Sequence, residues 1–272
     1  MPWRISSRWR PDAAMGVANI PLAARGLVQQ TGQIAGLVGA FVRVPVWYAL
    51  PRPRALARWI EVRFFRRLLR SLGIGVTHAG GHDLRPGTLY VCNHISWADI
   101  PVLASVLDAA FVARADAGNW PVLGRMMQRY GVILVDRTRR GTSATQVDAI
   151  RTRLTAGQSV IVFPEGTTSV GSDILPFRSS LLQAADAAGA VQPVVLRYLT
   201  PDGDALSEAQ QRDVAWIDDD TLLDGLRRVM RAPVRAHLEF LPPVAPYARK
   251  QMAVDLRDRM ADAYAALPSR SR

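Results

Sequence analysis

Short apolar runs alternate with stretches of helical spacing along the chain from residue 73 onward. Six runs rich in valine, isoleucine, leucine and alanine are typical of buried strands: Leu89–Cys92, Ala110–Ala113, Val132–Val135, Val160–Phe163, Val191–Arg197 and Ala236–Leu241. Apolar positions at helical spacing predict helices at about 98–108, 120–129, 142–156, 178–189, 219–231 and 247–266. The segment 201–218, which begins Pro-Asp-Gly-Asp, is predicted to be an exposed excursion between two strands. This alternation predicts one α/β domain over residues 73–272, with a mostly parallel or mixed sheet flanked by helices.

The first 72 residues follow a different pattern. The uncharged stretch 27–42 contains three glutamines and is shorter than the about 20 apolar residues that a membrane-spanning helix needs. Helical spacing resumes over residues 55–72, where Trp59, Phe65 and Leu69 mark one side and most arginines lie elsewhere. A basic, aromatic and amphipathic helix is typical of a membrane interface. A helix packed on the core with a solvated basic face has the same pattern, so the segment alone favours neither interpretation.

Charge separates the same two regions. The chain of 272 residues has a net charge of +11, and its apolar fraction of 49% excludes a disordered chain. Residues 1–70 carry twelve arginines against Asp12 and Glu61, a net of +10, whereas residues 71–272 are nearly neutral at +1. This excess predicts an anionic partner, either a phospholipid surface or a nucleic acid. Because no nucleic-acid recognition motif accompanies it, we expect residues 1–72 to be a basic helical segment that associates with a membrane.

Thiol and imidazole groups argue against a metal site. Cys92 is the only cysteine, which excludes a disulfide framework or a multi-thiolate site, and it ends an apolar run where packing is its expected role. His78 and His82 flank a glycine-rich turn without a third ligand. We therefore predict no metal.

A histidine and an aspartate follow the first predicted strand, in Asn93-His94-Ile-Ser-Trp-Ala-Asp99. Positions five apart diverge by about 140° on a continuous helix, so the pair meets only if His94 lies in a loop and Asp99 in the first turn of the next helix. An imidazole held by a carboxylate is a general base with a fixed tautomer. The stretch Ser96–Asp99 also matches a helix capping box, and a buried structural histidine is the alternative.

A second polar segment follows another predicted strand, in Phe163-Pro-Glu165-Gly166-Thr167-Thr168-Ser. Proline and glycine at these positions are typical of a tight turn. A carboxylate, a glycine and successive hydroxyls can also form a polar cradle for a phosphate or sugar-like headgroup. Taken alone, the segment favours the turn.

Together, Asn-His-x4-Asp and Phe-Pro-Glu-Gly-Thr, some seventy residues apart, resemble the motifs of the glycerolipid acyltransferases, especially the 1-acyl-sn-glycerol-3-phosphate (lysophosphatidic acid) type. Intermediate features agree in order and spacing. Gly131–Arg137 resembles the family's second block, Pro176-Phe177-Arg178 matches the basic residue after the third, and Gln192-Pro193-Val194 resembles the fourth. The resemblance covers about residues 70–200.

The resemblance implies a direct acyl transfer without an acyl-enzyme. His94 would deprotonate the acceptor hydroxyl and Asp99 would orient His94, while the acyl donor would be the thioester of acyl-CoA or an acyl carrier protein. The implied acceptor-binding residues are Asn93, Arg137, Glu165, Gly166, Thr167 and Arg178. No cofactor is implied, and the implied partners are a lysolipid acceptor and an anionic membrane surface on the cytoplasmic face.

One position departs from the family pattern. Lysophosphatidic acid enzymes usually have arginine where this chain has Thr168. Losing a fork-shaped cation weakens the case for a terminal phosphomonoester. The resemblance implies that the acceptor is 1-acyl-glycerol-3-phosphate, giving phosphatidic acid, and Thr168 makes lyso-ornithine lipid or another lysolipid the alternative.

Overall fold

Seven strands form a single sheet in the order β1-β7-β6-β2-β5-β3-β4 in the computed structural model, which describes residues 32, 36, 39, 54–114, 132–135, 142–217 and 220–267. The strands are β1 (Ile74–Ala79), β2 (Thr88–Cys92), β3 (Ala110–Arg114), β4 (Ile133–Val135), β5 (Val160–Val162), β6 (Ala190–Leu199) and β7 (Val234–Phe240). All neighbours pair in parallel except β6 and β7, which are antiparallel. The predicted α/β class with a mixed sheet is confirmed.

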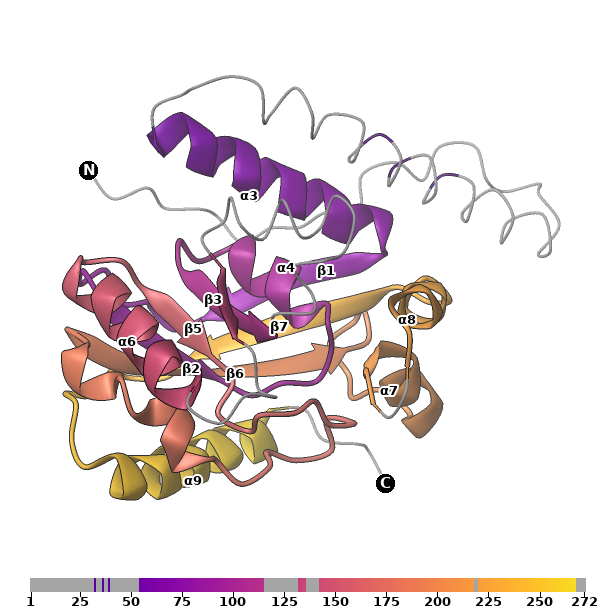
Figure 1. Ribbon diagram of the computed structural model, residues 1–272. Helices are drawn as coiled ribbons and strands as arrows, with labels where there is room; N and C mark the ends of the chain where they lie inside the picture. Colours follow the sequence, from indigo (N-terminus) through magenta and orange to yellow (C-terminus); the bar gives the residue numbers. More distant parts are fainter. Residues whose placement is uncertain are drawn as a thin grey trace, which may run out of the picture.

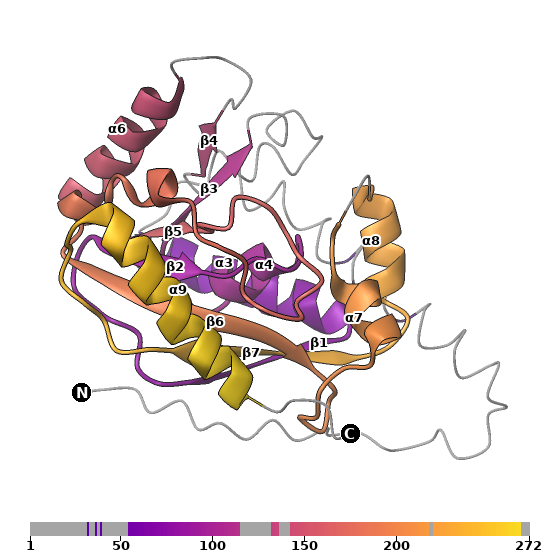
Figure 2. The same ribbon diagram turned by 90° about the horizontal axis from the view of Figure 1, so that it is seen from below.

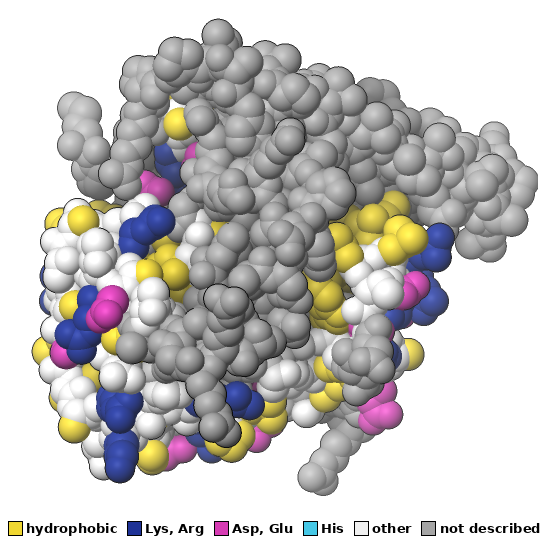
Figure 3. Space-filling model, in the orientation of Figure 1, with side chains coloured by type: hydrophobic (Ala, Val, Ile, Leu, Met, Phe, Trp, Pro, Cys, Tyr) yellow, Lys and Arg dark blue, Asp and Glu magenta, His cyan; other side chains and the backbone are white. Residues whose placement is uncertain are grey.

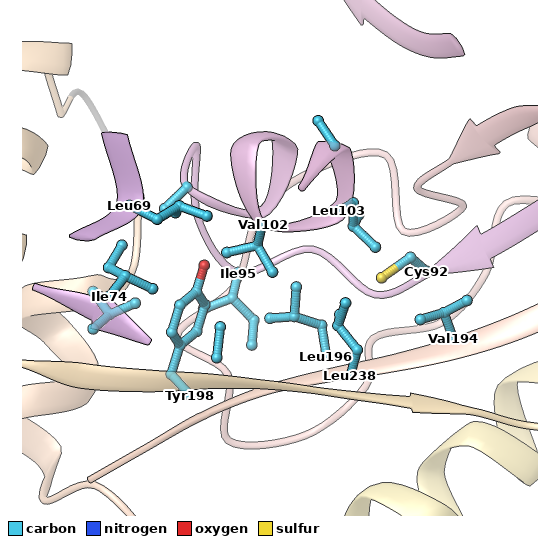
Figure 4. Close-up of a cluster of buried hydrophobic side chains, with 14 of the residues drawn as sticks. Leu69, Ile74, Cys92, Ile95, Val102, Leu103, Val194, Leu196, Tyr198 and Leu238 are labelled. Carbon is cyan, nitrogen blue, oxygen red and sulfur yellow. The ribbon is translucent and has the colours of Figure 1, made fainter. Parts of the chain in front are cut away.

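Helices cover both faces of this sheet (Figures 1 and 2). The helices are α3 (Arg54–Ser71), α4 (Asp99–Ala104), α6 (Thr142–Thr155), α7 (Glu208–Val214), α8 (Leu222–Val229) and α9 (Arg249–Ala266). Helices α3, α4, α7 and α8 contribute to one apolar core, part of which Figure 4 shows, and α6 and α9 contribute to a second core on the other face. This is the sandwich that alternating strands and helices predict.

The central strands β2, β5 and β6 are buried at every position because their side chains contribute to both cores. On β2, Leu89 and Val91 face the core beneath α9, whereas Tyr90 and Cys92 face the core beneath α4. Strand β6 is buried along its whole length for the same reason. Continuous apolar runs, rather than a strict alternation, are the expected sign of strands buried on two faces.

Helix α3 packs on the core through only one of its sides. Phe65 and Leu69 are buried against the domain, but Trp59, expected on that same side, is 56% exposed. The exposed side of α3 carries Trp59 together with Arg63, and the Arg63 guanidinium lies 4.7 Å from the centre of the Trp59 ring. Both interpretations of this segment therefore retain support: α3 is docked, and it presents a basic and aromatic surface to solvent.

No helix among the described residues combines the length and apolar character that crossing a bilayer requires. Hydrophobic and basic side chains nevertheless lie side by side over α8 (Figure 3). There, Leu223 is 52% exposed on the same short helix as Arg227.

Two predicted elements differ from the structure, and one observed strand has no predicted counterpart. The prediction of one helix at 178–189 is wrong. The segment forms two short 3-10 helices, Ser179–Leu182 and Ala185–Ala187, and neither has a side-chain cap. The segment 201–218, expected to be an exposed excursion, contains helix α7. The observed strand without a predicted counterpart is the edge strand β1, which comes directly before the glycine-rich turn. The helix expected at 120–129 lies outside the described residues.

Candidate active site

Strands β2 and β5 are neighbours in the sheet and run parallel, so their carboxyl ends lie side by side. His94 lies two residues after the end of β2, and Glu165 lies three residues after the end of β5. The loops beyond the carboxyl ends of parallel strands are where α/β proteins bind ligands. The two motif segments therefore meet at the predicted edge of the sheet.

His94 and Asp99 form the predicted pair. His94 lies in the loop after β2, Asp99 is the first residue of α4, and His94 Nδ1 is 2.8 Å from Asp99 Oδ2. Asp99 has no solvent exposure, whereas the His94 side chain is 20% exposed. With its proton on Nδ1 and donated to Asp99, the imidazole presents Nε2 as the basic nitrogen. The Nε2 atom forms no hydrogen bond with a described residue.

The Asp99 carboxylate is held by three further donors. Oδ2 also accepts hydrogen bonds from the backbone N–H groups of Ile95 (2.7 Å) and Ser96 (2.9 Å), and Oδ1 accepts one from the Tyr198 hydroxyl (2.8 Å). Such bonds offset the cost of burying a carboxylate. The predicted capping box is only half formed, because the Ser96 hydroxyl accepts from Ala98 N rather than Asp99 N.

The second motif segment, residues 163–169, forms hydrogen bonds with both the backbone N–H and the backbone carbonyl of His94. Glu165 Oε1 accepts a hydrogen bond from His94 N (3.2 Å), and Ser169 N donates to His94 O (3.0 Å). The Phe163 ring stacks on the imidazole, with the ring centres 4.0 Å apart. These contacts fix the height and tilt of the imidazole without engaging Nε2.

Glu165 is a buried carboxyl group with an unusual titration. Its side chain is 3% exposed, and Oε2 has no hydrogen-bond partner among the described residues. Burial raises the pKa of Glu165 to about 8, although the hydrogen bond from His94 N acts in the opposite direction. Glu165 is therefore a neutral acid over much of the physiological pH range.

The raised pKa of Glu165 predicts how the free energy of unfolding depends on pH. The folded state binds a proton at Glu165 that the unfolded state has released between about pH 4.5 and 8, so the free energy of unfolding falls as pH rises through that window. The slope from one such group is at most about 1.4 kcal/mol per pH unit. We expect Glu165→Gln, which retains a neutral hydrogen-bonding group, to remove this contribution. Denaturant unfolding at several pH values measures it, and Glu239→Gln on β7 is the control; equal slopes in the wild type and Glu165→Gln would contradict the prediction.

Gly166 and Arg178 lie against each other. Gly166 has φ of +72°, and a Cβ atom there would lie 3.1 Å from Cδ of the Arg178 side chain. Arg178 N donates to Pro164 O at 2.8 Å, which anchors the arginine to the turn, while its side chain is exposed. Thr167 is also exposed. An exposed cation beside exposed turn groups is suited to an anionic part of a substrate.

The other predicted acceptor-binding residues are placed differently. Asn93 is buried, with Nδ2 donating to Leu196 O (2.9 Å) and Oδ1 accepting from Leu196 N (2.8 Å). It thus fixes the start of the His94 loop to β6, and its contact with an acceptor stays a prediction. Arg137 lies outside the described residues.

Sequence reasoning missed Trp216, which follows α7. Its backbone N–H donates to Ile95 O at 3.0 Å, and its carbonyl oxygen accepts from the Thr168 hydroxyl. The Trp216 backbone therefore hydrogen-bonds to both motif loops. No local sequence pattern indicates this role of Trp216. Its indole N–H donates to the carbonyl of Asp220, whose carboxylate binds two arginines of α7 and α8.

Cys92 and the other histidines do not extend the site. The Cys92 thiol is buried, and burial raises its pKa well above the usual value, which disfavours the reactive thiolate. Among the described residues, no three histidine, cysteine or carboxylate side chains are grouped so that they could hold a metal ion.

Comparisons with known proteins agree with this geometry. The Acyltransferase family matches residues 75–197. A lyso-ornithine lipid O-acyltransferase of Brucella abortus is 35% identical over 72% of this chain and 79% of its own length, and one of Pseudomonas aeruginosa is 30% identical over 80% and 84%. A 1-acyl-sn-glycerol-3-phosphate acyltransferase of Neisseria meningitidis is 36% identical over 55% of this chain and 59% of its own length.

Among solved structures, the 1-acyl-sn-glycerophosphate acyltransferase PlsC from Thermotoga maritima superposes with a TM-score of 0.65 at 19% identity, over 91% of this chain and 99% of that chain. It shares the fold described above. With the histidine–aspartate pair at the edge of this sheet and relatives aligned over most of their length, the chain belongs to the acyltransferase family.

Proposed function

We propose that the protein transfers a fatty acyl group from acyl-CoA or an acyl carrier protein to the free hydroxyl of a lysolipid, with His94 as the general base. The observation that carries this proposal is the His94–Asp99 pair, in which Nδ1 is hydrogen-bonded to a fully buried carboxylate while the His94 side chain is partly exposed. An imidazole held in this tautomer is suited to taking a proton from a hydroxyl.

The reaction proceeds by direct attack. His94 Nε2 accepts the hydroxyl proton as the hydroxyl oxygen forms a bond to the thioester carbonyl carbon. The carbon–sulfur bond then breaks, and the leaving thiolate receives the proton from the imidazolium. Asp99 stabilises the imidazolium between these two proton transfers. This sequence of steps, as proposed, includes no cofactor.

The acceptor that the chain supports best is lyso-ornithine lipid or a similar lysolipid without a terminal phosphate. Thr168 stands where lysophosphatidic acid enzymes usually have arginine, and its hydroxyl donates to the Trp216 carbonyl instead of offering a cation to an acceptor. The names of the Brucella and Pseudomonas relatives support the same class. Lysophosphatidic acid is the second candidate, favoured by the exposed Arg178 beside Gly166 and by the Neisseria relative.

A competition between acceptors tests this assignment. Purified protein in mixed micelles receives a labelled acyl donor, as acyl-CoA and as acyl carrier protein in separate reactions, with lyso-ornithine lipid and lysophosphatidic acid at equal concentrations. We expect kcat/KM to be higher for lyso-ornithine lipid. A higher value for lysophosphatidic acid would reverse the choice of acceptor and assign phosphate binding to residues such as Arg178. No product from either lipid would reject both acceptors.

Helix α3 supports the further proposal that the active site works at an anionic membrane surface, on the cytoplasmic side where acyl-CoA and acyl carrier protein are found. Its exposed side combines Trp59 with Arg63, Arg66 and Arg70. Aromatic and basic side chains on one exposed helix face are typical of interfacial helices. Near an anionic surface each such cation contributes about 1 kcal/mol.

We expect that replacing Arg63, Arg66 and Arg70 with glutamine weakens binding to anionic vesicles by roughly 100-fold, from three cations at about 1 kcal/mol each. Substitution is preferable to deleting α3, because Phe65 and Leu69 belong to the core. Vesicle co-sedimentation at low salt measures the effect. The control replaces three cations of the opposite layer, namely Arg153, Arg249 and Lys250. Equal losses in the two triple variants would show that α3 is not the membrane-binding face.

A further inference from the structure

Tyr198 is a buried tyrosine of β6 whose hydroxyl contacts the catalytic pair. It is 5% exposed, and its hydroxyl donates to Asp99 Oδ1 at 2.8 Å. In Figure 4 the ring stands on β6 with its hydroxyl directed away from the strand, on the side of the sheet where α4 lies. Tyr198 follows directly after the residues that match the Acyltransferase family, and none of the four motif blocks contains it.

The two carboxylate oxygens of Asp99 accept different numbers of hydrogen bonds. Oδ2 accepts from His94 Nδ1 and from the N–H groups of Ile95 and Ser96, whereas the Tyr198 hydroxyl is the one described donor to Oδ1. Without that hydroxyl, one oxygen of a fully buried carboxylate would be left unpaired. An unpaired buried acceptor is costly, and the carboxylate would also lose the contact that limits its rotation about the Cβ–Cγ bond.

Tyr198 is suited to a permanent donor role. Burial raises the pKa of its phenol well above the usual value, and the negative charge of Asp99 acts in the same direction. The phenol therefore keeps its proton throughout the pH range in which acyl transfer is expected. Its ring is fixed in the core that α3 and α4 share with the sheet, so the hydroxyl has a defined position.

We propose that Tyr198 is a positioning residue for acyl transfer, which holds the Asp99 carboxylate in the orientation that directs Oδ2 at His94. The inference rests on the proposed function of His94, and it assigns Tyr198 to the same hydrogen-bonded chain as His94 and Asp99. Strand β6 then fixes the His94 loop at two points, through the Leu196 backbone to Asn93 and through Tyr198 to Asp99. A rigid central strand is a more exact support for a catalytic group than a loop is.

The test compares Tyr198→Phe with Tyr90→Phe. Tyr90 lies on the neighbouring strand β2, is 3% exposed, and donates its hydroxyl hydrogen to Asp83 O at 2.7 Å in a partly buried bond. Its phenylalanine variant therefore also loses one tyrosine hydrogen bond but leaves Asp99 untouched. Both substitutions retain the packed ring. For each protein, kcat, KM, the rate–pH profile and the melting temperature are measured, with rates expressed per folded protein.

We expect Tyr198→Phe to lower kcat by roughly tenfold with little change in KM, because a hydrogen bond to a charged group is lost in the catalytic machinery and the acceptor site is intact. The acid limb of the rate–pH profile should move to higher pH, since a less stabilised carboxylate holds the imidazolium more strongly. The other titratable groups near the pair, Glu165 and Cys92, are unchanged in this variant. Tyr90→Phe should retain the wild-type kcat and pH profile.

A purely structural role would lower the melting temperature of both variants and leave kcat per folded protein and the acid limb unchanged, and this result would overturn the proposal. A measurement that needs no substrate can reject the positioning role of Tyr198 independently of whether the proposed acyl transfer is correct. The ¹H NMR signal of the proton between His94 Nδ1 and Asp99, assigned by its loss in His94→Ala, should shift in Tyr198→Phe and not in Tyr90→Phe. An unshifted signal would equally reject the positioning role.

Discussion

Replacing His94 with alanine should nearly abolish acyl transfer while leaving the protein folded. General-base catalysis by a positioned side chain contributes about 10²- to 10⁴-fold, so we expect kcat to fall by roughly 10³-fold. The fold should tolerate the change because the His94 side chain is partly exposed, and Asp99 retains its hydrogen bonds from Ile95, Ser96 and Tyr198. The main structural loss is the stacking contact with Phe163.

Steady-state rates with the preferred acceptor, together with circular dichroism and vesicle binding, measure these effects. His82→Ala is the control, because His82 is an exposed histidine whose ring lies near Phe240 and which belongs to no motif. It should keep full activity. Substantial residual activity in His94→Ala at an unchanged melting temperature would remove His94 from the role of base.

Asp99→Asn should cost almost as much activity as losing His94. Four donors converge on the carboxylate, and the amide can offer only one oxygen to them. If the Asn nitrogen faces His94, the imidazole must accept at Nδ1, which places its proton on Nε2 and removes the basic lone pair. A wrong tautomer of this kind costs serine proteases about 10⁴-fold, and we expect a loss of about 10³-fold here, with about 1–3 kcal/mol of lost stability from unpaired buried groups.

Comparison of turnover with the folded fraction separates the two effects. Ser96→Ala is the control, because it removes the hydrogen bond between Ser96 Oγ and Ala98 N and thus disturbs the same turn without changing the pair. It should retain most of the activity. If the loss of turnover in Asp99→Asn matched its loss of folded protein, Asp99 would be only a structural support for the start of α4.

The central strands and the catalytic pair were predictable because their signals are local. Strands β2 and β5 are short apolar runs followed at once by polar motif residues, and the spacing of His94 and Asp99 allows contact only if a loop meets a helix start. The parallel pairing of these strands then brings Glu165 to His94. Each of these steps follows from residues that are close in sequence or from a general rule of α/β sheets.

The missed features depend on contacts between distant residues or on weak local signals. Tyr198 reaches Asp99 across 99 positions, and its apolar strand gives no reason to single out one aromatic residue. Helix α7 does carry a local signal, since Ser207 and Gln210 form a complete capping box at its start. Edge strand β1 contains Gly75 and ends near the glycine-rich turn, so its pattern is weak. The alanine-rich stretch before β6 favours a helix by composition, but its residues are divided into two 3-10 helices.

The claim that the protein joins an acyl group to a lysolipid hydroxyl is tested most directly by counting both products of one reaction. Purified protein is mixed with a labelled acyl thioester and lyso-ornithine lipid or lysophosphatidic acid, and free thiol and diacylated lipid are quantified together. We predict one new ester for each thiol released with at least one of the two lipids, and a rate of formation of both products that is lower by roughly 10³-fold with His94→Ala. Thiol release without ester would indicate a thioesterase, and the absence of both products with the wild-type protein would contradict the account.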